Sequence, residues 1–137
     1  MSDRDDFLHW FQTTWRAAET ALHKGDASPR FQTWSEQAPV TLFGAWLNAF
    51  TPEAAREAFQ RLAESFSEAT SSDIDLIAAE VSGDLAYTAH REITSTRVDG
   101  EPREYVLRVT QVYRREEGAW RVVHRHGDTE AVSAGAP

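Results

Sequence analysis

Apolar side chains near the start of the chain recur every three or four residues, which is the pattern of a helix with one buried face. This stripe consists of Phe7, Phe11, Trp15, Ala18 and Leu22. Gly25 follows it and is a natural place for the helix to end. The dipeptides Ser-Pro at 28–29 and Thr-Pro at 51–52 are typical of two further helix starts. The pattern therefore predicts three N-terminal helices.

From Ser71 onwards the pattern changes to alternating segments separated by turn residues, which is typical of β-strands. The predicted strands are residues 73–81, 84–97, 104–115 and 119–128, and residues 40–46 form a further short strand or turn. Helices followed by an antiparallel meander indicate an α+β fold. We expect a single domain over residues 1–137, with a frayed tail from about residue 129.

Composition narrows the range of partners. The 137 residues carry a net charge of −8, which argues against a general binder of nucleic acid or of anionic membranes. No apolar run is long enough to cross a membrane and no signal peptide is recognisable, so we expect a cytoplasmic protein. The absence of cysteine excludes disulfides, thiolate nucleophiles and thiolate metal sites.

The predicted pairing of the last strands gathers polar side chains on one face of the sheet. A three-residue loop that ends at Gly118 would place Arg108 opposite His126 and Thr110 opposite His124. A two-residue turn at 99–100 would place Arg91 opposite Arg108. The predicted ligand face consists of Tyr87, Arg91, Arg108, Thr110, His124 and His126.

This constellation has a functional and a structural interpretation. Opposed arginines repel unless an anion lies between them, and histidines can transfer protons near neutral pH, so the face suits an acid/base site for an anionic ligand. Alternatively, Arg91 and Arg108 pair with surface carboxylates and the histidines are satisfied core donors. A two-residue loop at 117–118 would also break the grouping and bring Arg125 beside Thr110.

Several aromatic and histidine residues outside this face bear on the same predicted pocket. Trp46 and Trp34 are predicted to form part of its apolar wall. His9 and His23 are expected to face solvent. The sequence His-x-His-x-Asp at 124–128 invites a metal site, but same-face strand positions lie about 7 Å apart, so no metal is predicted.

The last two predicted strands resemble the C-terminal hairpin of SnoaL-like proteins, a nuclear transport factor 2-like family that includes ketosteroid isomerase. The resemblance lies in the runs Leu-Arg-Val-Thr-Gln-Val-Tyr-Arg-Arg at 107–115 and Gly-Ala-Trp-Arg-Val-Val-His-Arg-His-Gly-Asp at 118–128, and in Asp-Leu-Ala-Tyr-Thr at 84–88. The ending is also similar to the association domain of calcium/calmodulin-dependent kinase II. That domain, however, has an arginine where this chain has Thr110.

The resemblance implies a cone-shaped α+β barrel with three helices packed on a curved antiparallel sheet, a pocket at the open end and a homodimer formed through the sheets. It leaves the function open, because the family includes isomerases, polyketide cyclases, dehydratases and non-catalytic modules. The carboxylate base and the tyrosine/aspartic acid pair of ketosteroid isomerase have no counterpart that can be placed in this chain.

Three functions remain open from the sequence. The first is an isomerase, cyclase or (de)hydratase without an organic cofactor. In it, Arg108, with or without Arg91, holds an oxygen of an apolar carboxylate or carbonyl compound, Thr110 orients it, and His124 or His126 moves a proton. The second is a non-catalytic module that binds a small-molecule ligand in the same pocket. The third is an assembly domain whose pocket is vestigial.

Overall fold

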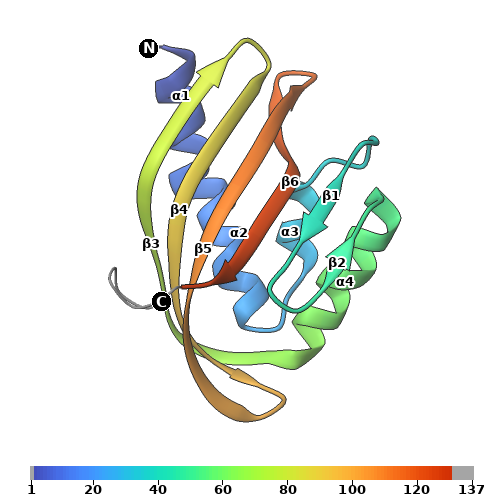
Figure 1. Ribbon diagram of the computed structural model, residues 1–137, viewed down its shortest axis with the longest axis vertical. Coiled ribbons are helices and arrows are strands. Elements are labelled where there is room, and N and C mark those ends of the chain that lie inside the picture. Colours follow the sequence, from blue (N-terminus) through green and yellow to red (C-terminus); the bar gives the residue numbers. More distant parts are fainter. Residues whose placement is uncertain (1, 131–137) are drawn as a thin grey trace, which may run out of the picture.

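A curved sheet holds helices on its concave face, and a fourth helix lies beside the short strands at one edge (Figure 1). This computed structural model describes residues 2–69 and 71–130. The helices are α1 (Asp3–Trp10), α2 (Arg16–His23), α3 (Ser28–Thr33) and α4 (Pro52–Ser65). The strands are β1 (Thr41–Phe43), β2 (Asn48–Ala49), β3 (Phe66–Ser82), β4 (Leu85–Val98), β5 (Glu101–Glu116) and β6 (Ala119–Thr129). No helix in the described ranges is long and apolar enough to cross a membrane.

The first predicted helix is continuous, because the π-helical segment Phe11–Trp15 (η1) joins α1 to α2. Side chains at two successive four-residue spacings do not stay on one face of an α-helix, which has 3.6 residues per turn. The wider turn of a π-helix keeps them in line. The rings of Phe11 and Trp15 accordingly stack at 4.5 Å, and the whole predicted stripe is buried. The three helices predicted from the sequence are therefore confirmed.

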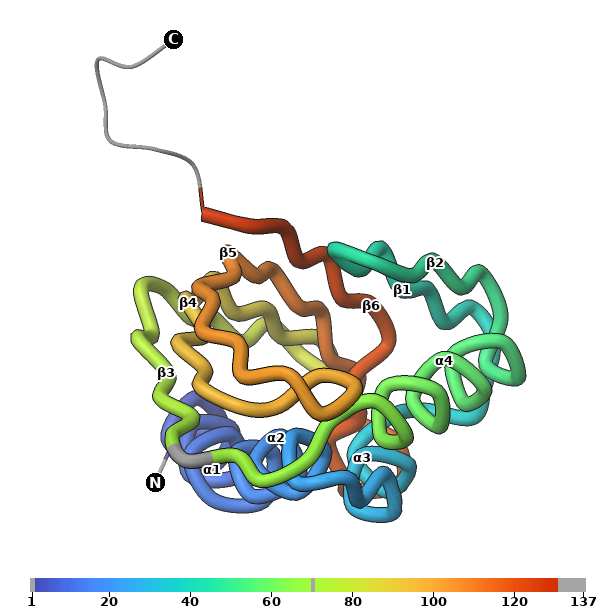
Figure 2. Tube along the Cα trace, turned by 90° about the horizontal axis from the view of Figure 1, so that it is seen from below, coloured from blue at the N-terminus to red at the C-terminus, as the bar shows by residue number. Residues whose placement is uncertain are grey.

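The sheet has six strands in the order β2-β1-β6-β5-β4-β3. The four long strands form the predicted antiparallel meander, whereas β1 pairs with β6 in parallel, so the sheet is mixed. Figure 2 shows the long strands curling over α1 and α2, an open cone rather than a closed barrel. The chain continues to pair at Glu130, which donates to Val106 O, and most of the tail predicted to be frayed lies outside the described residues.

The turn between β5 and β6 differs from the prediction. It is a two-residue turn, with Glu117 and Gly118 both at positive φ and Glu116 opposite Ala119, a geometry that suits the right-handed twist of a hairpin. The predicted three-residue loop is therefore wrong. The turn at 99–100 has the predicted two residues, and it places Arg91 opposite Arg108 as expected.

A β-bulge in β6 then changes which side chains face inwards. Tyr113 pairs with Val122 but Val112 pairs with His124, so Val123 is an extra residue. Before the bulge the even-numbered side chains of Trp120 and Val122 are buried, and beyond it the odd-numbered Arg125 is buried. His124 and His126 consequently lie on the outer face, where Thr110 is opposite His126 rather than His124.

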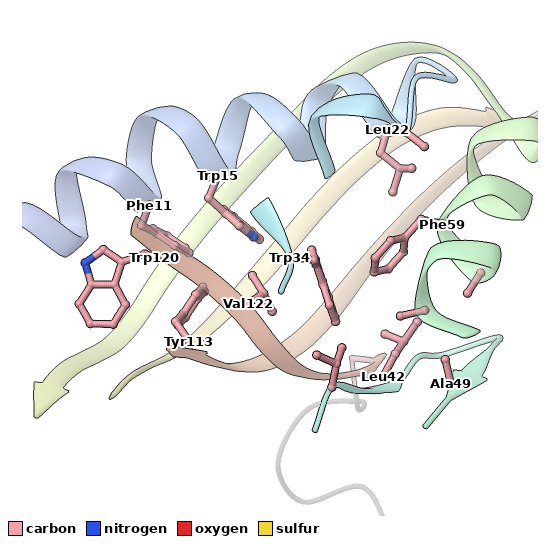
Figure 3. Packing of buried hydrophobic residues seen from close by; sticks show 14 of the residues in the cluster. Phe11, Trp15, Leu22, Trp34, Leu42, Ala49, Phe59, Tyr113, Trp120 and Val122 are labelled. Atoms are coloured by element: carbon pink, nitrogen blue, oxygen red, sulfur yellow. The ribbon is translucent and has the colours of Figure 1, made fainter. Parts of the chain in front are cut away.

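The apolar core lies between the helices and the inner face of the sheet (Figure 3). Phe7 and Phe11 from the first helix pack against Tyr113, with centroid distances of 4.8 and 6.3 Å. Trp34 packs edge-on against Phe59 of α4 at 4.7 Å. In contrast, the inner face of β4 is polar beyond Ala86, and its buried side chains there are Thr88, His90, Glu92, Thr94 and Thr96. Such a row of buried polar groups requires partners inside the protein.

Candidate functional site

A small cavity lies beneath the open end of the cone, between the ends of the helices and the inner face of β5 and β6. Its volume is about 40 Å³, enough for a water molecule or a small polar group. The polar side chains that line it are those of His23, Arg30, Tyr105 and Arg125, and the rest of the wall is largely apolar and includes five leucines. A larger, apolar groove of about 530 Å³ adjoins it and shares Trp46, Leu47, Leu62, Phe66 and Tyr105 with it.

Arg125 is held from behind by a buried carboxylate. Its Nη1 and Nη2 each donate to the Glu92 carboxylate at 2.7 Å, and Nη1 also donates to Gln111 Oε1 at 2.9 Å. Burial on its own raises the pKa of the Glu92 carboxyl, but the adjacent Arg125 and His90 outweigh it and hold the pKa well below its usual range. Glu92 is therefore a buried carboxylate anion that fixes the orientation of the guanidinium.

The same carboxylate anchors a chain of hydrogen bonds along β4 and β5. His90 Nε2 lies 2.9 Å from Glu92 Oε2, and His90 Nδ1 lies 3.2 Å from Thr88 Oγ1. The Thr88 hydroxyl lies 2.7 Å from the hydroxyl of Tyr113, which in turn accepts from Gln111 Nε2 at 2.5 Å. This network satisfies Thr88, His90 and Glu92 of the polar inner face of β4, which an apolar core could not do.

A second buried ion pair joins the helices to this network. Arg30 of α3 donates to Glu19 Oε2 of α2, and both side chains are almost fully buried. Glu19 Oε1 lies 3.6 Å from Arg125 Nη1, so two carboxylates and two guanidiniums neutralise one another. Within the described ranges, Glu19 Oε1 and Arg30 Nε have no hydrogen-bond partner. Such buried orphans point to a site that takes a further polar group.

His23 and Tyr105 form a neutral pair at the cavity wall. His23 Nδ1 donates to the carbonyl oxygen of Glu19 at 2.8 Å, which leaves Nε2 to accept from the Tyr105 hydroxyl at 2.9 Å. Burial lowers the pKa of His23 despite the nearby Glu19, and burial raises the pKa of Tyr105. Both groups are therefore uncharged at neutral pH. The expectation that His23 faces solvent is wrong, because this end of α2 packs against Phe66 and the sheet.

The predicted ligand face lies on the outer, convex side of the sheet. Arg91 pairs there with Glu130 and Asp75, and Arg108 forms two 3.0 Å hydrogen bonds to Asp128. Both arginines therefore pair with surface carboxylates, as the structural interpretation of the sequence allowed. The geometry leaves the ligand-binding role of this face as a prediction.

The other predicted residues lie on or near the same outer face. A shallow groove of about 430 Å³ contains Arg91, Arg108, Thr110 and His126, while Tyr87 is exposed on β4. His124 Nδ1 lies 2.7 Å from Thr41 Oγ1, and burial together with the nearby His126 lowers its pKa. Among the residues that the structure describes, no group of three histidine or acidic side chains could hold a metal ion.

The two predicted tryptophans lie in different environments. Trp46 is 56% exposed at the junction of cavity and groove, where its ring packs edge-on against Tyr105 at 5.3 Å. Trp34 is buried in the core against Phe59 and does not line the cavity, and its Nε1 has no partner among the described residues. Only Trp46 is therefore placed to contact a molecule in the cavity.

Sequence reasoning missed the four polar residues of the cavity wall, His23, Arg30, Tyr105 and Arg125. One signal was available: β4 carries Thr-x-His-x-Glu-x-Thr-x-Thr at 88–96, an alternating polar row whose opposite face includes Tyr87 and Ile93. A strand whose apolar side chains face solvent suggests that the polar row serves a site inside the protein.

Comparisons with known proteins agree with this architecture. A family model described as a SnoaL-like domain matches residues 11–128. A search of curated proteins found no match.

Several solved structures are similar in fold. A nuclear transport factor 2-like superfamily protein from Salmonella enterica superimposes with a TM-score of 0.76 at 17% identity, covering 98% of this chain and 96% of that one. A protein from Streptomyces avermitilis provisionally named a dehydratase has a TM-score of 0.75 at 16% identity, covering 93% of this chain and 99% of that one. A ketosteroid isomerase-like protein from Erwinia carotovora has a TM-score of 0.73 at 14% identity, covering 90% of this chain and 96% of that one. At these identities the likeness establishes the fold.

The buried Arg125–Glu92 pair predicts strong energetic coupling. We expect Arg125→Met to lower the free energy of unfolding by about 3–5 kcal/mol, because it leaves Glu92 buried without its partner. The double variant Arg125→Met/Glu92→Leu should lose much less than the sum of the single variants. Urea denaturation of all four proteins measures the coupling. The exposed cross-strand pair Arg108–Asp128 is the matched control and should couple by less than about 1 kcal/mol. Additive losses at 92 and 125 would contradict the account.

The lowered pKa of His23 predicts that stability falls in mild acid. The unfolded chain, with an ordinary histidine pKa of 6.5, takes up this proton more readily than the folded protein, so stability falls as the pH drops below that value. One such group contributes at most about 1.4 kcal/mol per pH unit. His23→Gln should reduce, but not remove, the dependence between about pH 7 and about pH 5, because the pKa of His124 is lowered too. His9→Gln, at an exposed position of α1, is the control and should leave the slope of stability against pH unchanged. If His23→Gln also leaves this slope unchanged, His23 is not a buried neutral group.

Proposed function

The chain belongs to the family of SnoaL-like domains, and on this premise we propose that the cavity beside Tyr105 takes the carboxylate or carbonyl oxygen of a small, mostly apolar molecule whose body lies in the adjoining groove. The observation that carries the proposal is the chemistry of the wall. The polar side chains that line the cavity are Arg30, Arg125, Tyr105 and His23, while the carboxylates of Glu19 and Glu92 lie behind the arginines. Arginine donors beside the Tyr105 hydroxyl, at the inner end of an apolar groove, suit an oxygen acceptor at one end of an apolar body.

The charge balance of the site favours a carbonyl or carboxylate oxygen over a more highly charged anion. Each guanidinium already has a carboxylate partner, so the cavity has little excess positive charge. A carbonyl oxygen, or a carboxylate that shares the existing donors, could therefore bind without leaving a buried arginine unpaired. Arg30 Nε, which has no hydrogen-bond partner among the described residues, is a donor that such an oxygen could satisfy.

As an enzyme, the site would work as an isomerase, cyclase or (de)hydratase with His23 and Tyr105 as its acid/base pair. His23 Nε2 is a neutral acceptor bonded to the Tyr105 hydroxyl, and both side chains line the cavity, so the phenol could pass its proton to His23 as it takes one from the ligand. The arginines would stabilise negative charge that develops on the ligand oxygen. If the same cavity binds without turnover, the protein is a ligand-binding module.

A binding experiment tests the proposal. At about 100 times its dissociation constant, a ligand such as decanoate or a cyclic ketone should add about 2.7 kcal/mol to the free energy of unfolding, seen as a higher melting temperature. Tyr105→Phe keeps the ring beside Trp46 but removes the hydroxyl, and should weaken binding by about threefold to tenfold. His126→Gln, on the outer face, should bind as the wild type does. The reverse result would favour the ligand face, and the proton-transfer roles of His124 and His126, predicted from the sequence.

We also propose that the outer face of the sheet forms a homodimer. Apolar side chains are exposed on it, among them Leu85, Tyr87 and Ile93 of β4, and Ile77 is exposed on β3 beside them. A two-fold contact would bury this patch against a second copy. Ile93→Glu should convert a dimer into a monomer in analytical ultracentrifugation, whereas Gln60→Glu, at an exposed position of α4, should not. A wild-type protein that sediments as a monomer would contradict the proposal.

A further inference from the structure

The groove outside the cavity has an apolar floor and a cationic rim. Trp46, Leu62, Phe66, Val98 and Tyr105 supply apolar surface in its volume of about 530 Å³. Arg61 of α4 and Arg103 of β5 also line it, from opposite sides: Figure 2 shows the far end of the β4–β5 hairpin reaching towards α4. A molecule that leaves the cavity through this groove therefore passes between two arginines.

These two arginines differ from the others in their contacts. Nine of the thirteen arginines form ion pairs within the part of the chain that the structure describes. Arg4 and Arg121 donate to backbone carbonyls. Arg61 and Arg103 make no ion pair and no side-chain hydrogen bond to any described residue, although the protein carries a net charge of −8. Both are exposed, so neither is needed to neutralise a buried charge.

Glu104 is the one acidic residue among those that line the described groove, and it does not neutralise the rim. Its Oε1 accepts from Ser95 Oγ at 3.3 Å, across the β4–β5 pairing. Glu104 forms no ion pair with Arg61 or with Arg103 in the described ranges. The rim of the groove, which we call the mouth, thus keeps the guanidiniums of Arg61 and Arg103 with N–H donors available to solvent or to a ligand.

We propose that the ligand carries a second, anionic group, such as a carboxylate, which Arg61 and Arg103 hold at the mouth while its apolar body lies against Trp46. The inference rests on the proposed function, because it takes the inner oxygen to be bound at Tyr105 and Arg125. The ligand class is then a mostly apolar compound with an oxygen acceptor at one end and an anion at the other. Straight-chain α,ω-dicarboxylates are its simplest members.

Matched acids test this class of ligand by isothermal titration calorimetry. Straight-chain monocarboxylates of increasing length, decanoate among them, and the dicarboxylates of the same lengths are titrated into the wild type, Arg61→Gln/Arg103→Gln and Arg121→Gln. We expect one dicarboxylate length to bind tighter than the monocarboxylate of the same length. The double variant should lose about tenfold in affinity for that dicarboxylate and keep its affinity for decanoate. Added salt should weaken the dicarboxylate more than decanoate. Arg121→Gln, far from the mouth, should change neither affinity.

The outcomes separate this inference from the proposed function. If decanoate binds and Tyr105→Phe weakens it, but no dicarboxylate gains over its monocarboxylate, the second anion site is refuted and the proposed function stands. If the double variant weakens both kinds of acid alike, the mouth arginines hold the single carboxylate, and the inference is overturned. If neither kind of acid binds the wild type, both proposals fail. Arg61 and Arg103 are exposed and Arg121 is half-buried, and none of them forms an ion pair with a described residue, so the variants should keep the wild-type circular dichroism spectrum.

Discussion

The buried ion pair between Arg125 and Glu92 determines how the inside of this protein is arranged. It joins β6 to β4 across β5, and Gln111 of β5 completes the contact. An unpaired charge at this depth would cost several kcal/mol, so the two side chains fix each other's position and the register of three strands. His90, Thr88 and Tyr113 are then oriented by the same carboxylate through successive hydrogen bonds. The cavity wall depends on this arrangement, because Arg125 forms part of it.

Most of the fold could be predicted from the sequence because its signals are local. The stripe from Phe7 to Leu22, the proline-containing helix starts and the positive-φ turn at 99–100 each depend on residues near in sequence. The parallel pairing of β1 with β6 was not predicted, since a three-residue strand carries little pattern of its own. Family membership, found independently for residues 11–128, agrees with the resemblance of the C-terminal hairpin.

The candidate site could not be predicted in the same way, because one extra residue decides it. Without the bulge at Val123, the buried Trp120 and Val122 would place His124 and His126 inside, and Arg125 outside. No property of a Val-Val pair reveals which valine is unpaired. The inward turn of His23 likewise depends on the packing of α2 against Phe66 and Tyr105, which are far away in sequence. The polar row of β4 was the one sequence feature that pointed to the inner face.

We have proposed that the ligand binds to the helix-covered face of the sheet. The most direct test is a nuclear magnetic resonance titration of the full chain with decanoate, in which the amide and indole N–H signals are followed. We expect shifts at the Trp46 indole and at the Tyr105 and Leu107 amides, which border the cavity, while the amides of Thr110 and His126 change little. Shifts centred on Thr110 and His126 instead would place the ligand on the outer face and rule out binding at the inner cavity.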